Sequence, residues 1–168
     1  MERILIIGCP GAGKSTFGRA LSEKTSIPLV HLDRLYWCGD WEHVSREEFD
    51  ILLQTELEKP RWIIDGNFNR TIPKRLQYCD RVFYLDLPTR VCLWGVTKRV
   101  FESWGKTRSD MGGNCPERFD RHKPELYKAV LQFRKQHRNA YLEMLKHSGK
   151  EVTVFHSRKE MNKFLENL

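Results

Sequence analysis

Short apolar runs alternate along the chain with longer segments in which apolar residues recur at helical spacing. Each run has the length and composition of a buried strand. The runs lie at residues 3–7, 27–32, 62–65, 82–85 and 152–155. This alternation predicts an α/β fold of three α/β/α layers, in which a doubly wound parallel sheet binds ligands at the carboxyl ends of its strands.

The segments between the runs carry helix signals. Ser45 and Glu48 form a capping box at the start of one helix, and Ser157 and Glu160 form another near the end of the chain. Helices are predicted over residues 14–24, from 45 to 60, over 88–101, from 124 to near 149 and from 157 onward, with a short helix or turn over 69–80.

Residues 105–123 interrupt this pattern, because they are polar, contain glycine and show no periodicity. Loops of this length in compact domains usually have a function. We expect a mobile lid over about residues 102–123, inserted in a single domain that spans residues 1–168.

A glycine-rich loop follows the first strand and precedes the first helix. Its sequence, GCPGAGKST, matches the phosphate-binding pattern G-x-x-x-x-G-K-[ST] in full. Glycines let backbone N–H groups turn toward phosphates, and the following helix adds its positive end. Lys14 is expected to reach the β- and γ-phosphates and Ser15 to bind Mg²⁺. The expected nucleotide contacts are Gly8, Gly11, Ala12, Gly13, Lys14, Ser15 and Thr16.

The sequence also bears on where the γ-phosphate goes. Many hydrolytic ATPases place a glutamate after the acidic residue that ends a later strand, but Asp65 is followed by Gly66 and Asn67. The base-reading motif Asn-Lys-x-Asp of switch GTPases is absent, since the one Asn-Lys pair precedes Phe164. Transfer to an acceptor is therefore favoured over hydrolysis.

Acidic and aromatic residues mark a candidate acceptor side. Asp33 follows the second strand, where its carboxylate would accept the proton of an incoming hydroxyl, orient the acceptor, or simply cap a helix. Asp65 would bind Mg²⁺ through water or contact the acceptor. Trp37 and Trp41 would either stack on a ring-shaped acceptor or cover the core. His31 is expected to be a buried strand-end residue. The predicted acceptor contacts are Asp33, Arg34, Trp37, Asp65, Gly66 and Asn67.

Basic residues concentrate around the lid. Residues 98–146 contain twelve Lys and Arg against six Asp and Glu, which accounts for +6 of the net charge of +7. Such an excess is typical of a nucleic-acid face, of a polyphosphate pocket or of solvated helix surfaces. We expect the arginines to neutralise the transferring phosphoryl group on lid closure, with Arg108 and Arg118 catalytic, Arg99 on the nucleotide, and Arg134 and Arg138 on the acceptor.

Composition adds few constraints. Hydrophobic residues make up 40% of the chain, and no apolar run is long enough to span a membrane. The five cysteines show neither CxxC spacing nor a matched histidine pair, and no export signal is visible. We therefore expect a cytoplasmic protein. The oligomeric state is left open.

Several blocks together resemble a known family. The glycine loop, HLDRLYW, WIIDGNF, FYLDLP and GKTRSDMGGNCPERFD look like the DNA topology modulation proteins, a branch of the adenylate-kinase-like P-loop kinases. The resemblance implies a sheet of strand order 2-3-1-4-5, ATP with Mg²⁺ at the loop, an acceptor region between the second and third strands, and a closing lid. By position, Lys14 and Ser15 match the phosphate and metal contacts and Asp33 matches the acceptor-side acid. The four-cysteine zinc lid and the arginine pattern that grips a nucleoside monophosphate are not found.

Three hypotheses remain open at this stage. The leading one is a kinase that transfers the γ-phosphate of ATP to a small acceptor such as a nucleoside, nucleotide or metabolite. An alternative is an ATP-binding protein that acts on DNA through its basic segment, although no DNA-binding motif spacing is present. A third is a nucleotide sensor without turnover.

Overall fold

The computed structural model describes residues 2–118 and 123–168. Five parallel strands form the central sheet, in the spatial order β2-β5-β1-β6-β7. Counted along the chain within this sheet, the order is 2-3-1-4-5, as the family resemblance implies. The strands are β1 (Arg3–Gly8), β2 (Leu29–His31), β5 (Trp62–Asp65), β6 (Arg81–Leu85) and β7 (Glu151–Phe155).

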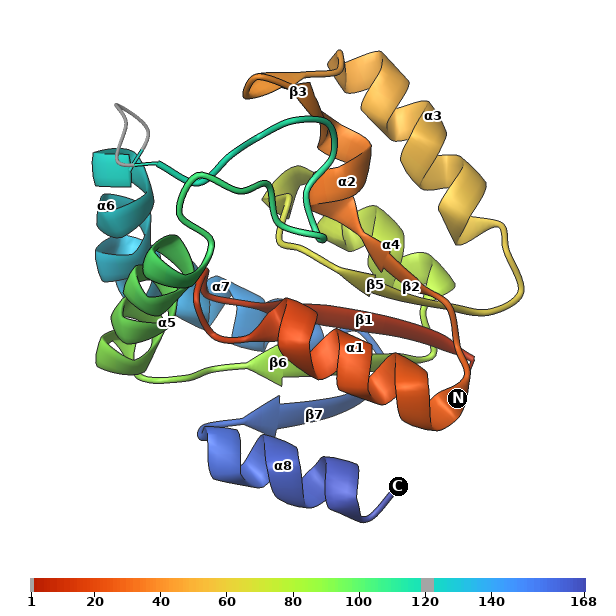
Figure 1. Cartoon of the computed structure of the whole chain (residues 1–168). Helices are drawn as coiled ribbons and strands as arrows, with labels where there is room; N and C mark the ends of the chain where they lie inside the picture. Colours follow the sequence, from red (N-terminus) through yellow and green to blue (C-terminus); the bar gives the residue numbers. More distant parts are fainter. Residues whose placement is uncertain (1, 119–122) are drawn as a thin grey trace.

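Helices cover both faces of this sheet, which gives the expected three layers. In Figure 1, α1 and α8 lie in front of the sheet, while α4 and α7 lie behind it. The helices are α1 (Lys14–Thr25), α2 (Leu32–Tyr36), α3 (Arg46–Leu57), α4 (Ile72–Tyr78), α5 (Thr89–Glu102), α6 (Lys123–Phe133), α7 (Asn139–Lys146) and α8 (Arg158–Glu166). In the described residues, no helix has both the length and the apolar character that crossing a membrane requires.

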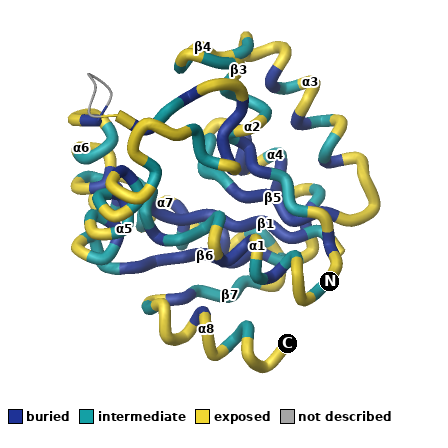
Figure 2. Tube along the Cα trace, viewed as in Figure 1, coloured by how far each residue is buried: buried dark blue, intermediate teal, exposed yellow. Residues whose placement is uncertain are grey.

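Burial explains why β1 lies at the centre. Residues Ile4 to Ile7 are completely buried, as are Ile63 and Ile64 of β5 on one side and Val82 to Leu85 of β6 on the other. Figure 2 shows these strands as the continuous buried layer of the molecule. Because a strand with apolar residues on both faces needs cover on both sides, the helices must flank it. The registers place Gly8 beside Leu85 and Ile6 beside Asp65, so the carboxyl ends of the three strands meet at one edge.

The predicted helix caps are present. The Ser45 hydroxyl accepts a hydrogen bond from the Glu48 N–H at 3.1 Å, and the Ser157 hydroxyl accepts one from the Glu160 N–H at 3.2 Å. The long helix predicted after Pro124 is interrupted, because Arg134–Arg138 forms a π-helical segment between α6 and α7. A π-helical turn rotates every later side chain relative to an unbroken α-helix.

The stretch after β2 contains elements that the sequence did not predict. It forms the short helix α2 and then an antiparallel hairpin of β3 (Trp37–Gly39) and β4 (Glu42–His43). Trp37 and Trp41 pack edge to face across this hairpin, with ring centroids 5.4 Å apart. The short strands had no periodicity long enough to detect, so aromatic pairing and the turn at Asp40 determine the hairpin.

The segment between α5 and α6, described for residues 103–118, is the lid segment. It arches from the α5 side of the molecule over to α2 and β3, above the carboxyl edge of the sheet (Figure 1). Residues 103–118 of the predicted lid thus form an irregular segment between two helices. Arg121, one of the arginines beside it, lies outside the described residues.

Candidate active site

The glycine loop joins β1 to α1 as a tight turn. Gly11 and Gly13 have φ values of 81° and 98°, a left-handed conformation that favours glycine. A Cβ on Gly11 would collide with the carbonyl oxygen of Cys92, so helix α5 packs directly on the loop. Gly8 packs against Leu85 in the same way and does not face the cavity. The loop thus has the open backbone concavity that a phosphate group needs.

Lys14 is the first residue of α1, and its side chain turns back over the loop. Its Nζ donates hydrogen bonds to the carbonyl oxygens of Gly8 at 2.8 Å and Cys9 at 3.2 Å. Burial lowers the pKa of Lys14, whereas the nearby carboxylates, Asp65 and Asp33 among them, act in the opposite direction. The ammonium group is therefore held at the mouth of the loop, where it would meet an anion.

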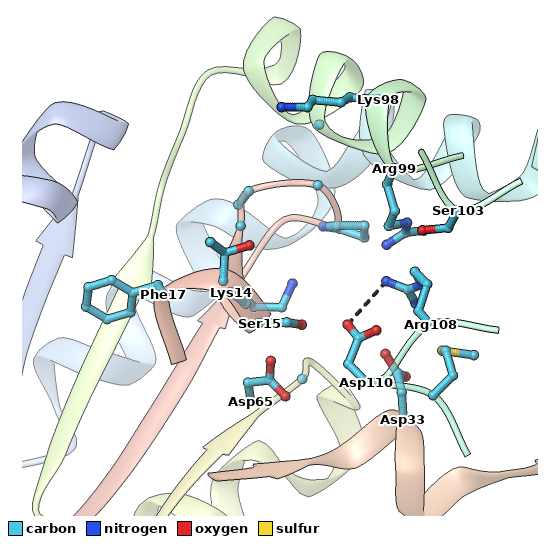
Figure 3. Close-up of a pocket in the computed structure, with 18 of the residues that line it drawn as sticks. Lys14, Ser15, Phe17, Asp33, Asp65, Lys98, Arg99, Ser103, Arg108 and Asp110 are labelled. Atoms are coloured by element: carbon cyan, nitrogen blue, oxygen red, sulfur yellow. Dashed lines mark hydrogen bonds and ion pairs between the residues drawn. The ribbon is translucent and has the colours of Figure 1, made fainter. Parts of the chain in front are cut away.

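A cavity of about 1070 Å³ opens over this loop. Its walls come from α1, α2, α5, the end of β5 and the lid segment, and Figure 3 shows many of the lining side chains. The volume is at the upper end of the range for small-molecule sites. Sequence-predicted residues that line it are Gly11, Ala12, Gly13, Lys14, Ser15, Thr16, Asp33, Trp37, Asp65, Gly66, Asn67, Arg99 and Arg108.

Three carboxylates face the loop from the opposite wall. Asp33, Asp65 and Asp110 approach Ser15 from α2, β5 and the lid segment (Figure 3). Burial raises the pKa of Asp33, the positive charge of Arg108 opposes this, and the negative charge of Asp65 reinforces it. Burial also tends to raise the pKa of Asp110, but Arg108 and a hydrogen bond with Ser15 bring it below its usual value. Asp110 was not singled out from the sequence, although it lies in the lid motif.

Asp65 ends β5 and is almost completely buried. Its Oδ1 is 2.8 Å from Nδ1 of His31, which is also buried at the end of β2. His31 is therefore a buried strand-end residue, as predicted, and it fixes the orientation of the Asp65 carboxylate. Within the described residues, no three His, Cys, Asp or Glu side chains are grouped as a metal ion would require.

The Asp65-Gly-Asn loop is anchored on both sides. The Asn67 Oδ1 accepts a hydrogen bond from the Gly8 N–H at 3.2 Å. This bond connects the Asp65-Gly-Asn loop to the start of the phosphate loop. On the other side, the fully buried Arg75 of α4 donates to the carbonyl oxygens of Gly66 at 2.9 Å and of Asn67. Burial lowers the pKa of Arg75 to about 10, so its guanidinium stays charged at neutral pH. Sequence analysis missed Arg75 because it lies within an ordinary amphipathic helix.

Replacing Arg75 with methionine should destabilise the protein by about 3 kcal/mol, since buried carbonyl groups would lose charged hydrogen-bond donors. Equilibrium urea unfolding measures this change. Lys74→Met on the same helix, where the side chain is only half-buried, is the matched control and should change stability little. Equal stability of the two variants would contradict the anchoring role of Arg75.

Cations from α5, the lid segment and α6 converge on one buried carboxylate, Glu117. Its Oε1 is 3.1 Å from Nε of Arg108 and 3.5 Å from Nε of Arg99, and Lys123 pairs with its Oε2. Arg99 and Arg108 both point into the cavity above the phosphate loop (Figure 3). In the described part of the chain, neither Nε atom makes a hydrogen bond of good geometry, although both are buried. Both guanidinium groups are thus paired with Glu117 and also line the cavity over the phosphate loop. Glu117 was not identified from the sequence.

Other predicted arginines lie elsewhere. Arg138 binds the carboxylate of Asp86 at 2.8 and 3.0 Å, and Arg134 donates to the Leu87 carbonyl at 3.3 Å. Neither lines the cavity, and Arg34 and Arg118 are exposed and do not line it either. The structure therefore does not bring these four predicted site residues to the candidate site.

The lid segment is in contact with the hairpin of the acceptor side. The Asn114 carbonyl accepts a hydrogen bond from the Asp40 N–H at 2.8 Å, and Lys123 lies 5.2 Å from the ring centroid of Trp41. Gly112 packs so closely that a Cβ would collide with the carbonyl oxygens of Trp37 and Arg34. The lid segment therefore packs on the hairpin, and this close packing depends on a residue without a side chain.

Gly112→Ala should prevent the lid from seating and lower kcat/KM about a hundredfold, because displacements of an ångström have costs of that order in a preorganised site. Steady-state kinetics with ATP and an acceptor would measure this, with thermal unfolding to verify the fold. Lys106→Ala, at an exposed position of the same segment, is the control. Unchanged kinetics for Gly112→Ala would show that closure is not needed.

The fold is a three-layer α/β/α arrangement with a phosphate-binding loop between β1 and α1. Shikimate kinase from Bacteroides thetaiotaomicron has the same fold, with a TM-score of 0.58 over 99% of this chain and 95% of that one, at 17% identity. Identity at this level shows the fold alone.

The matches to sequence relatives cover smaller parts of the chain. Adenylate kinase of Thermotoga neapolitana is 28% identical over 88 residues, which are 51% of this chain and 39% of the relative. An uncharacterized protein of Bacillus subtilis, YqaC, is 32% identical over 109 residues, 62% of this chain and 60% of that protein. The matched region thus spans about two fifths to three fifths of the curated relatives. No family model matches the chain.

Proposed function

We propose that the protein is an ATP-dependent phosphotransferase that acts on a small-molecule acceptor in the cytoplasm. The observation that carries this proposal is the common cavity, in which Lys14 and Ser15 of the phosphate loop lie opposite the half-buried carboxylate of Asp33. Arg99 and Arg108 of the lid side line the same cavity. A donor loop, a candidate base and charge-stabilising groups are the parts that phosphoryl transfer requires.

The loop residues fit ATP with Mg²⁺. The glycine turn, the N-terminus of α1 and the Lys14 ammonium suit a polyphosphate, and Arg99 and Arg108 add positive charge to the cavity lining. The Ser15 hydroxyl would hold Mg²⁺ together with phosphate oxygens and water, with Asp65 behind it. When bound, the metal would neutralise phosphate charge. The chain's own residues orient the acceptor, exclude water by lid closure and accept its proton at Asp33.

An action on DNA, which the family resemblance suggested, is the competing function. Arg99, Arg108 and Lys123 are turned toward Glu117 and the cavity rather than presented as an outer basic face. This arrangement supports a small polyphosphate ligand over a duplex.

A panel of metabolites tests the proposal by ADP formation. One acceptor class should raise ATP consumption strongly, and Lys14→Ala should abolish that rise. Absence of any stimulating acceptor, combined with salt-sensitive duplex binding that Lys14→Ala leaves intact, would favour the DNA function instead.

A further inference from the structure

A second hollow of about 340 Å³ adjoins the main cavity. The two share Asp33, Trp37 and Phe68, so the second hollow continues the site away from the phosphate loop. Its size is that of a site for a small molecule. The other lining residues are Tyr36, Arg46, Phe49, Asn69, Arg70 and Thr71.

Aromatic rings form its walls. Phe49 and Phe68 are stacked, with centroids 4.8 Å apart and planes at 27°. Tyr36 meets Phe68 and Phe49 edge to face at 5.0 and 5.7 Å, and Trp37 packs against Tyr36 at 5.0 Å. These contacts, together with stacking of Tyr36 on His43, hold the rings in fixed orientations, so the wall of the hollow is rigid and aromatic. Such a wall suits a ring compound better than a flexible chain.

Charge differs between the two ends of this hollow. At the inner end, the carboxylate of Asp33 has a raised pKa because it is buried and close to Asp65. At the outer end lie Arg46 and Arg70. Asp50 binds the Arg70 guanidinium through two hydrogen bonds of 2.7 and 2.9 Å, which neutralises its charge. Arg46, the exposed first residue of α3, has no ion pair with any residue in the described ranges.

The geometry points to an acceptor that is a ring compound with a hydroxyl at one end and a carboxylate or phosphate at the other. This inference rests on the proposed kinase function. The hydroxyl would donate a hydrogen bond to Asp33, the ring would lie against the aromatic wall, and the anionic group would pair with Arg46. An acceptor that presents its own phosphate to the donor would instead place a second anion beside Asp33, where like charges repel.

The reaction is balanced without any further reactant. The acceptor hydroxyl oxygen forms a bond to the γ-phosphorus of ATP, while the bond from that phosphorus to the β–γ bridging oxygen breaks. ADP leaves with the electron pair of that bond. The hydroxyl proton passes to the Asp33 carboxylate and then to solvent.

The product's chemistry tests this inference. Ring hydroxy acids and nucleoside 5′-monophosphates represent the carboxylate and phosphate forms, and the corresponding amides and nucleosides are their uncharged counterparts. Each is incubated with ATP, Mg²⁺ and the full-length protein, and the product is identified by ³¹P NMR. A phosphate ester of an anionic ring compound is the expected result. A new phosphoanhydride, or equal use of the uncharged counterparts, overturns the inference but leaves the kinase function intact. If no acceptor raises ADP formation above the rate measured without acceptor, both the inference and the kinase function are overturned.

A variant locates the anion subsite. Arg46→Gln should raise the KM of the anionic acceptor by about tenfold or more while the KM of ATP and the use of the uncharged counterpart stay the same. Arg61→Gln, at an exposed arginine beyond the other end of α3, is the matched control and should change none of these values. An unchanged acceptor KM in Arg46→Gln would overturn the assignment of Arg46.

Discussion

Lys14→Met should lower kcat by about a thousandfold or more while the protein stays folded, because removing a preorganised charge at a transferring phosphoryl group has an effect of this order. The side chain is held over the loop by two carbonyl groups, which places its ammonium before any ligand arrives. Methionine keeps much of the aliphatic volume but carries no charge. The expected loss therefore reports charge stabilisation rather than packing.

Lys24→Met is the control for this variant, since Lys24 is exposed in the last turn of the same helix. Coupled measurement of ADP gives kcat, and nucleotide titration followed by thermal shift shows whether ATP is still bound. If Lys14→Met turned over at the rate of Lys24→Met, the loop would bind a ligand without taking part in transfer. The sensor hypothesis would then be favoured.

The donor side of this site was predictable from the sequence because its determinants are local. Spacing within nine residues specifies the loop, and the flanking apolar run and helix specify its place in the sheet. Strand order came from the family resemblance, and the structure has the same order. Local spacing also located the lid, although it did not reveal which of its residues matter.

The acceptor side depends on contacts between distant segments, which spacing does not encode. Glu117 pairs with cations from α5, the lid segment and α6, and its place in the lid motif does not reveal these partners. Arg46 and Phe68 come together because the start of α3 packs on the segment after β5, where Phe49 stacks on Phe68. Arg134 and Arg138, by contrast, were predicted as site residues but lie outside the cavity. Both belong to the π-helical segment and pair with the buried Asp86.

Asp33→Asn should reduce kcat by about a hundredfold to ten-thousandfold, the range for loss of a general base, with little change in ATP binding. Asparagine preserves the shape and one acceptor oxygen but cannot take the proton. Asp40→Asn, at an exposed position of the hairpin turn, is the matched control. Acceptor-dependent ADP formation and nucleotide titration separate the two effects.

The pH dependence gives this prediction a second, independent outcome. The pKa of Asp33 is raised above its ordinary value of 3.8 by burial, so the wild-type rate should fall as the pH decreases through this raised pKa. This decrease of the rate at low pH, the acid limb, should vanish in Asp33→Asn.

A raised carboxylate pKa also means that the folded state disfavours the ionised form, so the ionised carboxylate destabilises the fold at pH values above this pKa. Asp33→Asn should therefore be more stable at neutral pH and less active, whereas a purely structural aspartate would lose stability on replacement. If Asp33→Asn were less stable than the wild type and its rate still fell at low pH, Asp33 would not be the base of the reaction.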